Sequence, residues 1–68
     1  MTFTVEYEQE SDGRWLAEVL ELRGVLAYGA TSEEALAKTQ ALALRVLADR
    51  LEHGEGAPEF VSISFAAA

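Results

Sequence analysis

The sequence predicts a small α+β domain in which three strands are followed by one helix and a last strand. Three observations support this prediction. Apolar and polar residues alternate in several short segments, with the period of a half-buried strand. One longer segment is rich in alanine and leucine and contains no glycine or proline, which is typical of a helix. The length of 68 residues fits a single domain, residues 1–68, and leaves no room for a second.

The chain opens with a predicted hairpin. Phe3–Gln9 alternates between two faces, with its apolar residues on one of them. Ser11–Gly13 has the composition of a turn, in which Gly13 can take a positive φ. Arg14–Leu22 is the second strand, and it carries apolar residues on both faces. This two-sided pattern indicates that the second face is also partly covered.

A short third strand is expected at Val25–Tyr28. Gly24 and Gly29 bracket it, at positions where the backbone needs conformational freedom. The three strands together can form an antiparallel meander.

A helix is predicted from Ser32 to about His53, with its end at Gly54 or Gly56. Thr31–Glu34 has the composition of a capping box. In such a box the first hydroxyl accepts a hydrogen bond from the fourth N–H, and the fourth side chain can return one to the first N–H. The two glutamates of this segment also suit the positive end of the helix dipole.

Two surfaces of this helix are apolar. One is the predicted core stripe, formed by Ala35, Leu36, Thr39, Leu42, Ala43, Val46, Leu47 and Leu51. The other is a flank that makes the whole apolar surface wider than one sheet needs, formed by Ala37, Ala41, Leu44 and Ala48. Alanine on this flank is explained by its high helix propensity, or else by contact with a like subunit or another partner.

The last strand is predicted at Glu59–Phe65, after Pro58, and the tail Ala66–Ala68 is expected to fray. Because the helix reverses the chain direction, this strand must pair parallel to a strand of the meander. A right-handed crossover places it beside the first strand. The predicted architecture is therefore a four-stranded mixed sheet of order 3-2-1-4, with the helix packed on one face.

The composition excludes several classes of function. Twelve acidic residues stand against five basic ones, giving a net charge of −7, which repels phosphates and attracts a basic partner. Without cysteine there is no disulfide and no thiolate metal site. The single histidine, His53, is expected at the C-terminal end of the helix, where it can stabilise the negative end of the helix dipole. No signal sequence or membrane-spanning run is found, so a cytoplasmic protein is expected.

No enzymatic activity and no cofactor or metal are expected. Nucleophilic catalysis needs a base beside the nucleophile, and a nuclease needs several carboxylates that converge on metal ions. The last strand carries no carboxylate within its alternating segment. Glu6, Glu8 and Glu10 project from one face of the first strand, where they form a solvated face, a weak cation site or part of a partner surface.

Three segments in order resemble the HicB-like antitoxin family, a group of small domains. They are DGRWLAE at Asp12–Glu18, ELRG at Glu21–Gly24 and YGATSEEAL at Tyr28–Leu36. The similarity extends over most of the chain, from Phe3 to about Gly54. Leu20 and Arg23 stand where the family often has proline, and Ala30 stands where it usually has an acidic residue.

The resemblance implies a partial ribonuclease-H-like fold and a function. HicB proteins neutralise HicA, a small basic toxin that cleaves mRNA, by covering its active surface. Many members carry a further C-terminal DNA-binding module, which these 68 residues do not contain. The resemblance therefore implies masking of a toxin, with no direct binding of nucleic acid by this domain.

The expected partner surface is the acidic face of the sheet with nearby aromatic residues: Glu6, Glu8, Glu10, Glu18, Trp15 and Tyr28. For Trp15, packing in the core is the alternative. The alternative function is a solitary regulatory or structural homo-oligomer, without toxin or catalytic activity. It would assemble through the sheet edges or through the helix flank Ala37, Ala41, Leu44 and Ala48.

Overall fold

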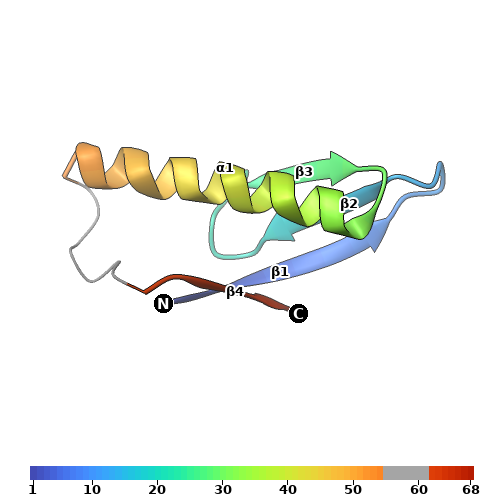
Figure 1. Cartoon of the computed structure of the whole chain (residues 1–68), viewed down its shortest axis with the longest axis horizontal. Helices are drawn as coiled ribbons and strands as arrows, with labels where there is room; N and C mark the ends of the chain where they lie inside the picture. The colour runs from blue at the N-terminus through green and yellow to red at the C-terminus, as the bar shows by residue number, and fades with distance from the viewer. Residues whose placement is uncertain (55–61) are drawn as a thin grey trace.

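The computed structural model describes residues 1–54 and 62–68, and it has the predicted α+β architecture (Figure 1). The four strands form one sheet of order β3-β2-β1-β4, with the single helix on one face. The elements are β1 (Thr2–Gln9), β2 (Trp15–Val19), β3 (Leu26–Gly29), α1 (Ser32–Glu52) and β4 (Ser64–Ala67).

The hairpin turn between β1 and β2 is formed as predicted. Gly13 has a φ of 93°, and Arg14 N–H donates to the Asp12 carboxylate at 3.0 Å. The Arg14 guanidinium binds the same carboxylate at 2.8 Å. The backbone N–H and the guanidinium of Arg14 together hold the pKa of Asp12 below its ordinary value. The turn therefore contains its own ion pair, which has both partners exposed.

The second strand is shorter than predicted, because β2 ends at Val19 instead of continuing to Leu22. The backbone turns at this point, with Leu22 N–H donating to the Val19 carbonyl at 3.2 Å. Gly24 completes the turn with a φ of 83°. A side chain then satisfies the backbone of β1, since Thr4 N–H donates to the carboxylate of Glu21 at 2.7 Å.

The helix has the predicted bounds and one half of the predicted capping box. Thr31 is the N-cap, and its hydroxyl accepts from Glu34 N–H at 3.0 Å. The Glu34 carboxylate instead pairs with Lys38 at 2.9 Å, and this partner lowers the pKa of Glu34. At the other end, His53 is the C-cap, and Gly54 follows with a φ of 72°.

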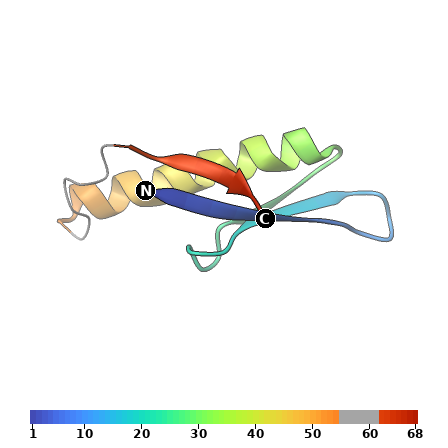
Figure 2. The ribbon, with the colours of Figure 1, turned by 90° about the horizontal axis from the view of Figure 1, so that it is seen from below.

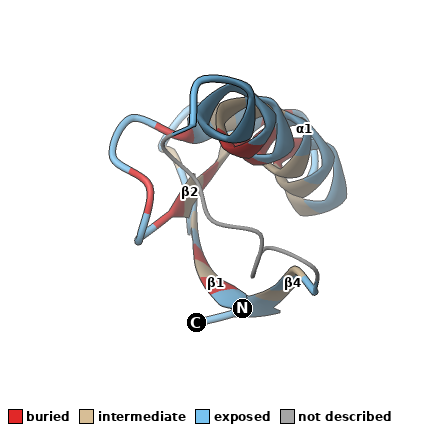
Figure 3. Ribbon diagram, turned by 90° about the vertical axis from the view of Figure 1, so that its left-hand side faces the viewer, coloured by how far each residue is buried: buried red, intermediate tan, exposed pale blue. Residues whose placement is uncertain are grey.

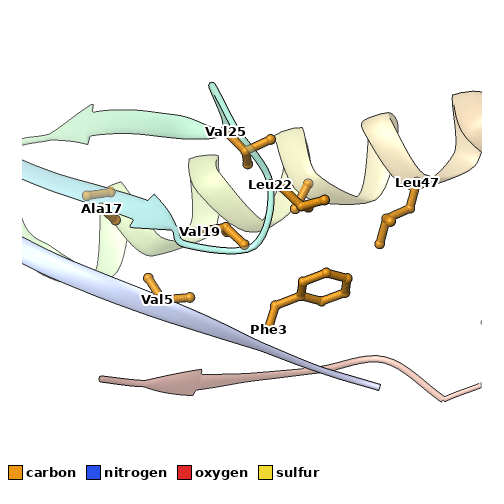
Figure 4. Packing of buried hydrophobic residues seen from close by; sticks show 9 residues of the cluster. Phe3, Val5, Ala17, Val19, Leu22, Val25 and Leu47 are labelled. Atoms are coloured by element: carbon orange, nitrogen blue, oxygen red, sulfur yellow. The ribbon is translucent and has the colours of Figure 1, made fainter.

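The core lies between α1 and the inner face of the sheet, which is the face turned toward the helix (Figures 3 and 4). The helix packs mainly over β2 and β3, and in Figure 3 β1 and β4 lie farther from it. Thr39 is the buried polar residue of the helix, and its hydroxyl donates to the Ala17 carbonyl at 3.1 Å. The buried apolar residues are Phe3, Val5, Ala17, Val19, Leu22, Val25, Ala35, Ala43 and Leu47.

Gly29 is needed for space at the join between β3 and the helix. A Cβ at this position would lie 2.5 Å from the backbone nitrogen of Ala35. Its φ is not positive, unlike that of Gly24. The expectation of backbone freedom is therefore confirmed at Gly24, while at Gly29 the close approach of the helix is the reason for glycine.

The last strand lies later in the chain than predicted. Among the described residues it spans Ser64–Ala67, without Ser62 and Ile63, and it includes Ala66 and Ala67, which were expected to fray. These alanines pair with β1, and Ala68 N–H donates to the Val5 carbonyl at 2.8 Å. Residues 55–61, which include the expected helix end at 56 and the expected strand start at 58–61, lie outside the described residues.

Within residues 1–54 and 62–68, no helix is both long enough and apolar enough to cross a membrane.

Candidate partner-binding surface

The sheet has an outer face, turned away from α1, on which acidic and apolar side chains lie next to one another. The strand register places them in two rows across three strands. In one row Glu8, Leu16 and Tyr28 are neighbours, and in the other Glu6, Glu18 and Leu26 are neighbours. We call these six residues the outer patch: Glu6, Glu8, Leu16, Glu18, Leu26 and Tyr28.

Two carboxylates of the outer patch lie directly opposite each other. Glu6 on β1 pairs in register with Glu18 on β2. Like charges at such cross-strand positions destabilise a sheet. In the described part of the chain, the salt bridges join Arg14 to Asp12, Lys38 to Glu34 and His53 to Asp49, so none of them neutralises this pair.

The apolar part of the outer patch is open to solvent. Leu26 is 38% exposed and Tyr28 is 39% exposed, while Leu16 between Tyr28 and Glu8 is half-buried. The Arg14 guanidinium lies 4.4 Å from the centre of the Tyr28 ring, a cation–π distance. Apolar and aromatic side chains therefore lie exposed beside the carboxylates of the outer patch.

The outer patch contains no pocket suited to a small molecule. Glu6, Tyr7, Glu8, Leu16 and Glu18 line a hollow of about 20 Å³, which has room for roughly one water molecule. A substrate or cofactor site is far larger, about 300–1,000 Å³.

Two residues of the predicted surface lie elsewhere. Trp15 shares the inner face with Ala17 and packs, half-buried, against the core. Glu10 follows the end of β1 in the hairpin turn, where its N–H donates to the Arg14 carbonyl at 2.7 Å. Of the predicted residues, the structure thus brings Glu6, Glu8, Glu18 and Tyr28 together.

Sequence reasoning missed Leu16 and Leu26 as members of this surface. The signal for Leu16 was present, because the second strand has apolar residues on both of its faces. Leu26 lies between a buried valine and an alanine in a very short strand. The face of the sheet on which its side chain lies could therefore not be assigned without the register.

The predicted helix flank is exposed as a whole. Ala37, Ala41, Leu44 and Ala48 all lie on the solvent side of α1, and Leu44 is 48% exposed. This flank is separate from the outer patch, because α1 lies on the opposite face of the sheet.

The single histidine lies at the end of the helix. The His53 Nδ1 lies 2.8 Å from the Asp49 carbonyl, at the negative end of the helix as expected. Within residues 1–54 and 62–68, no three histidine or acidic residues are placed so that they could hold a metal ion.

Compared with family models, curated proteins and solved structures, the chain has no significant match. The case for a function therefore depends on the residues of the outer patch and on the sequence segments described above.

Proposed function

We propose that this chain is a protein-binding module that docks a small basic protein on its outer patch, as an antitoxin of the HicB-like kind. The observation that carries the proposal is the cross-strand pair Glu6 and Glu18, neither of which forms a salt bridge within the described residues. Exposed Leu26 continues the same row.

A basic partner would supply the positive charge that the outer patch lacks. A lysine or arginine placed over Glu6 and Glu18 would remove their repulsion and form charge-assisted hydrogen bonds. Leu26 and Tyr28 would provide the apolar centre that lets an interface exclude water. The net charge of −7 would speed the encounter with a basic protein.

The partner in this proposal is a HicA-type mRNA interferase, and the inhibition is steric. The domain covers the active surface of the toxin and takes no chemical part in RNA cleavage. Because the target of such a toxin is mRNA, the proposal also places the pair in the cytoplasm.

The exposed helix flank supports a second candidate function, a homo-oligomer without a toxin. Leu44 lies in the middle of a stripe of alanines that would allow two helices to approach closely. If this is the function, a second copy of the chain covers Ala37, Ala41, Leu44 and Ala48.

The first test is co-expression with a HicA-type toxin encoded by the neighbouring reading frame. We expect rescue of growth and co-purification of the two proteins. Rescue should fail in the double variant Glu6→Lys and Glu18→Lys, with affinity falling by about 100-fold or more because each buried interfacial charge contact is worth roughly 2 kcal/mol or more.

Glu52→Lys is the matched control for each of the single variants Glu6→Lys and Glu18→Lys, since it makes the same charge change at the exposed end of the helix. It should slow association slightly and leave rescue intact. If the control weakens binding as much as the outer-patch variants, the effect is one of net charge and the outer patch is not the interface. If neither variant changes the affinity, the toxin binds elsewhere.

A further inference from the structure

The sheet has two edges, and at the β4 edge no strand of the described residues pairs with the outward-facing backbone groups. Among the described residues, β4 is hydrogen-bonded to β1 on one side and to no strand on the other. Ser64 N–H donates to Met1 and Ala68 N–H donates to Val5, so these alternate residues face β1. The N–H and C=O groups of Phe65 and Ala67 therefore point away from the sheet.

This edge lacks the charged and proline residues that protect many exposed strands from pairing. Natural edge strands are protected by short length, charged residues, proline or a bulge. Of these, β4 has the short length, with four residues. The segment Ser62–Ala68 contains no charged side chain and no proline. At the opposite edge, by contrast, the Arg14 guanidinium lies over Tyr28 of β3. The two edges of the same sheet thus differ in their protection.

The distribution of charge indicates which partner can approach the β4 edge. Two copies of a chain with a net charge of −7 repel each other over most of their surfaces. The outer patch, with its three glutamates, is on the strands β1 to β3. Ser62–Ala68 has no carboxylate side chain, so a second copy can meet it there with the least repulsion.

We propose that two copies of this chain pair antiparallel through β4. A two-fold axis perpendicular to the sheet would pass beside Ala66 and make one continuous sheet, with both helices on the same face. Phe65 of one copy would then exchange backbone hydrogen bonds with Ala67 of the other. Ala66 would lie opposite its own equivalent, in a pair without direct hydrogen bonds.

The side chains at this edge suit the pairing. Phe65 is half-buried on the inner face, where its ring centre lies 5.8 Å from that of Phe3. In the paired sheet the methyl group of Ala67 from the second copy would extend this inner row beside Phe65. In Figure 2 the strand β4 runs alongside β1, and among the described residues it is the last strand of the sheet on that side.

This dimer and the proposed toxin-binding function use different parts of the sheet. The outer patch is centred on β1, β2 and β3, whereas the dimer uses the backbone edge of β4. Loss of one can therefore be observed without loss of the other.

The first experiment measures the mass of the chain by sedimentation equilibrium across micromolar concentrations. We expect twice the monomer mass for the unchanged chain. Ala67→Pro removes an N–H that points away from β1, and it should weaken dimerisation roughly 30-fold while circular dichroism stays unchanged. Ala48→Lys on the helix flank is the matched control and should leave the dimer intact.

The second experiment does not depend on a proline being tolerated. The chain has no cysteine, so Ala66→Cys introduces a single thiol on an exposed residue. Opposed residues in such a pair have Cα atoms about 4.5 Å apart, which a disulfide can bridge. We expect rapid formation of a disulfide-linked dimer under mild oxidation, and slow formation for Ala48→Cys.

Three results would overturn the proposal. They are a monomer at every concentration for the unchanged chain, a dimer that Ala48→Lys disrupts and Ala67→Pro does not, and equal rates of cross-linking for the two cysteine variants. The second of these results would place the dimer on the helix flank instead.

Discussion

The two faces of the sheet come from the same strands and the same alternation, but they contain different chemistry. The inner face is apolar and is covered by the helix, with Val5, Ala17 and Val19 almost completely buried. The outer face combines exposed Leu26 and Tyr28 with opposed carboxylates. The inner face accounts for folding. The opposed charges of the outer face oppose folding. The binding role proposed above would account for their presence.

The two faces should differ most in how much free energy of unfolding is lost when a leucine is replaced by alanine. Leu47 is 2% exposed in the core and Leu26 is 38% exposed on the outer face. Leu47→Ala should lower the free energy of unfolding by about 2–5 kcal/mol. Leu26→Ala should change it by about 0.5 kcal/mol or less. Urea denaturation measures both, and equal losses would mean that the outer face is part of the folding core.

The join between the sheet and the helix should be the next most sensitive position. Gly29→Ala would place a Cβ 2.5 Å from the Ala35 backbone nitrogen, and backbone cannot yield as a flexible side chain can. We expect a loss of about 1–3 kcal/mol in the free energy of unfolding. Thermal unfolding followed by circular dichroism tests this. Gly24→Ala is the comparison, because its Cβ would meet open space and its cost would come from the positive φ alone.

Removing one of the opposed charges of the outer face should raise the free energy of unfolding, whereas the substitutions above lower it. Glu18→Gln removes the repulsion with Glu6 and keeps the size of the side chain. The free energy of unfolding should rise by about 0.2–1 kcal/mol, and the gain should shrink in high salt. The same variant should bind a HicA-type toxin less tightly. A variant that is less stable than the parent would show that Glu18 serves the fold, and the argument for the outer patch would lose its main support.

Much of the fold could be predicted because its signals are local. The capping threonine, the uninterrupted helix and Gly54 define the helix ends, and direction and handedness then give the sheet order. The placement of β4 could not be predicted in this way. Its bounds are set by pairing with β1, which places Phe65 opposite Phe3, and alanine at 66 and 67 gives no strand signal of its own.

The candidate surface was only partly predictable for a related reason. Alternation along one strand identifies which glutamates share a face, and Glu6 and Glu8 were grouped correctly on this basis. It does not say which residues of another strand stand opposite them. The pairing of Glu6 with Glu18 and the position of Leu26 depend on the register between neighbouring strands. That register is set by the folded conformation of the β1–β2 hairpin turn and of the six-residue loop between β2 and β3.

The smallest expected effect is on the pH dependence of stability, and it concerns Glu21, an acidic residue that stabilises the fold and lies outside the outer patch. Glu21 accepts the Thr4 N–H at 2.7 Å, and this hydrogen bond holds the pKa of Glu21 below its ordinary value of 4.5. The unfolded chain therefore binds a proton more readily at this residue, so its contribution to stability is complete above pH 4.5 and is lost as the pH falls through the lowered pKa. Glu21→Gln should flatten the fall in stability below pH 4.5, as measured by urea denaturation at a series of pH values. An unchanged slope would show that the carboxylate does not hold the end of β1 in solution, and that the Thr4 N–H is satisfied by water instead.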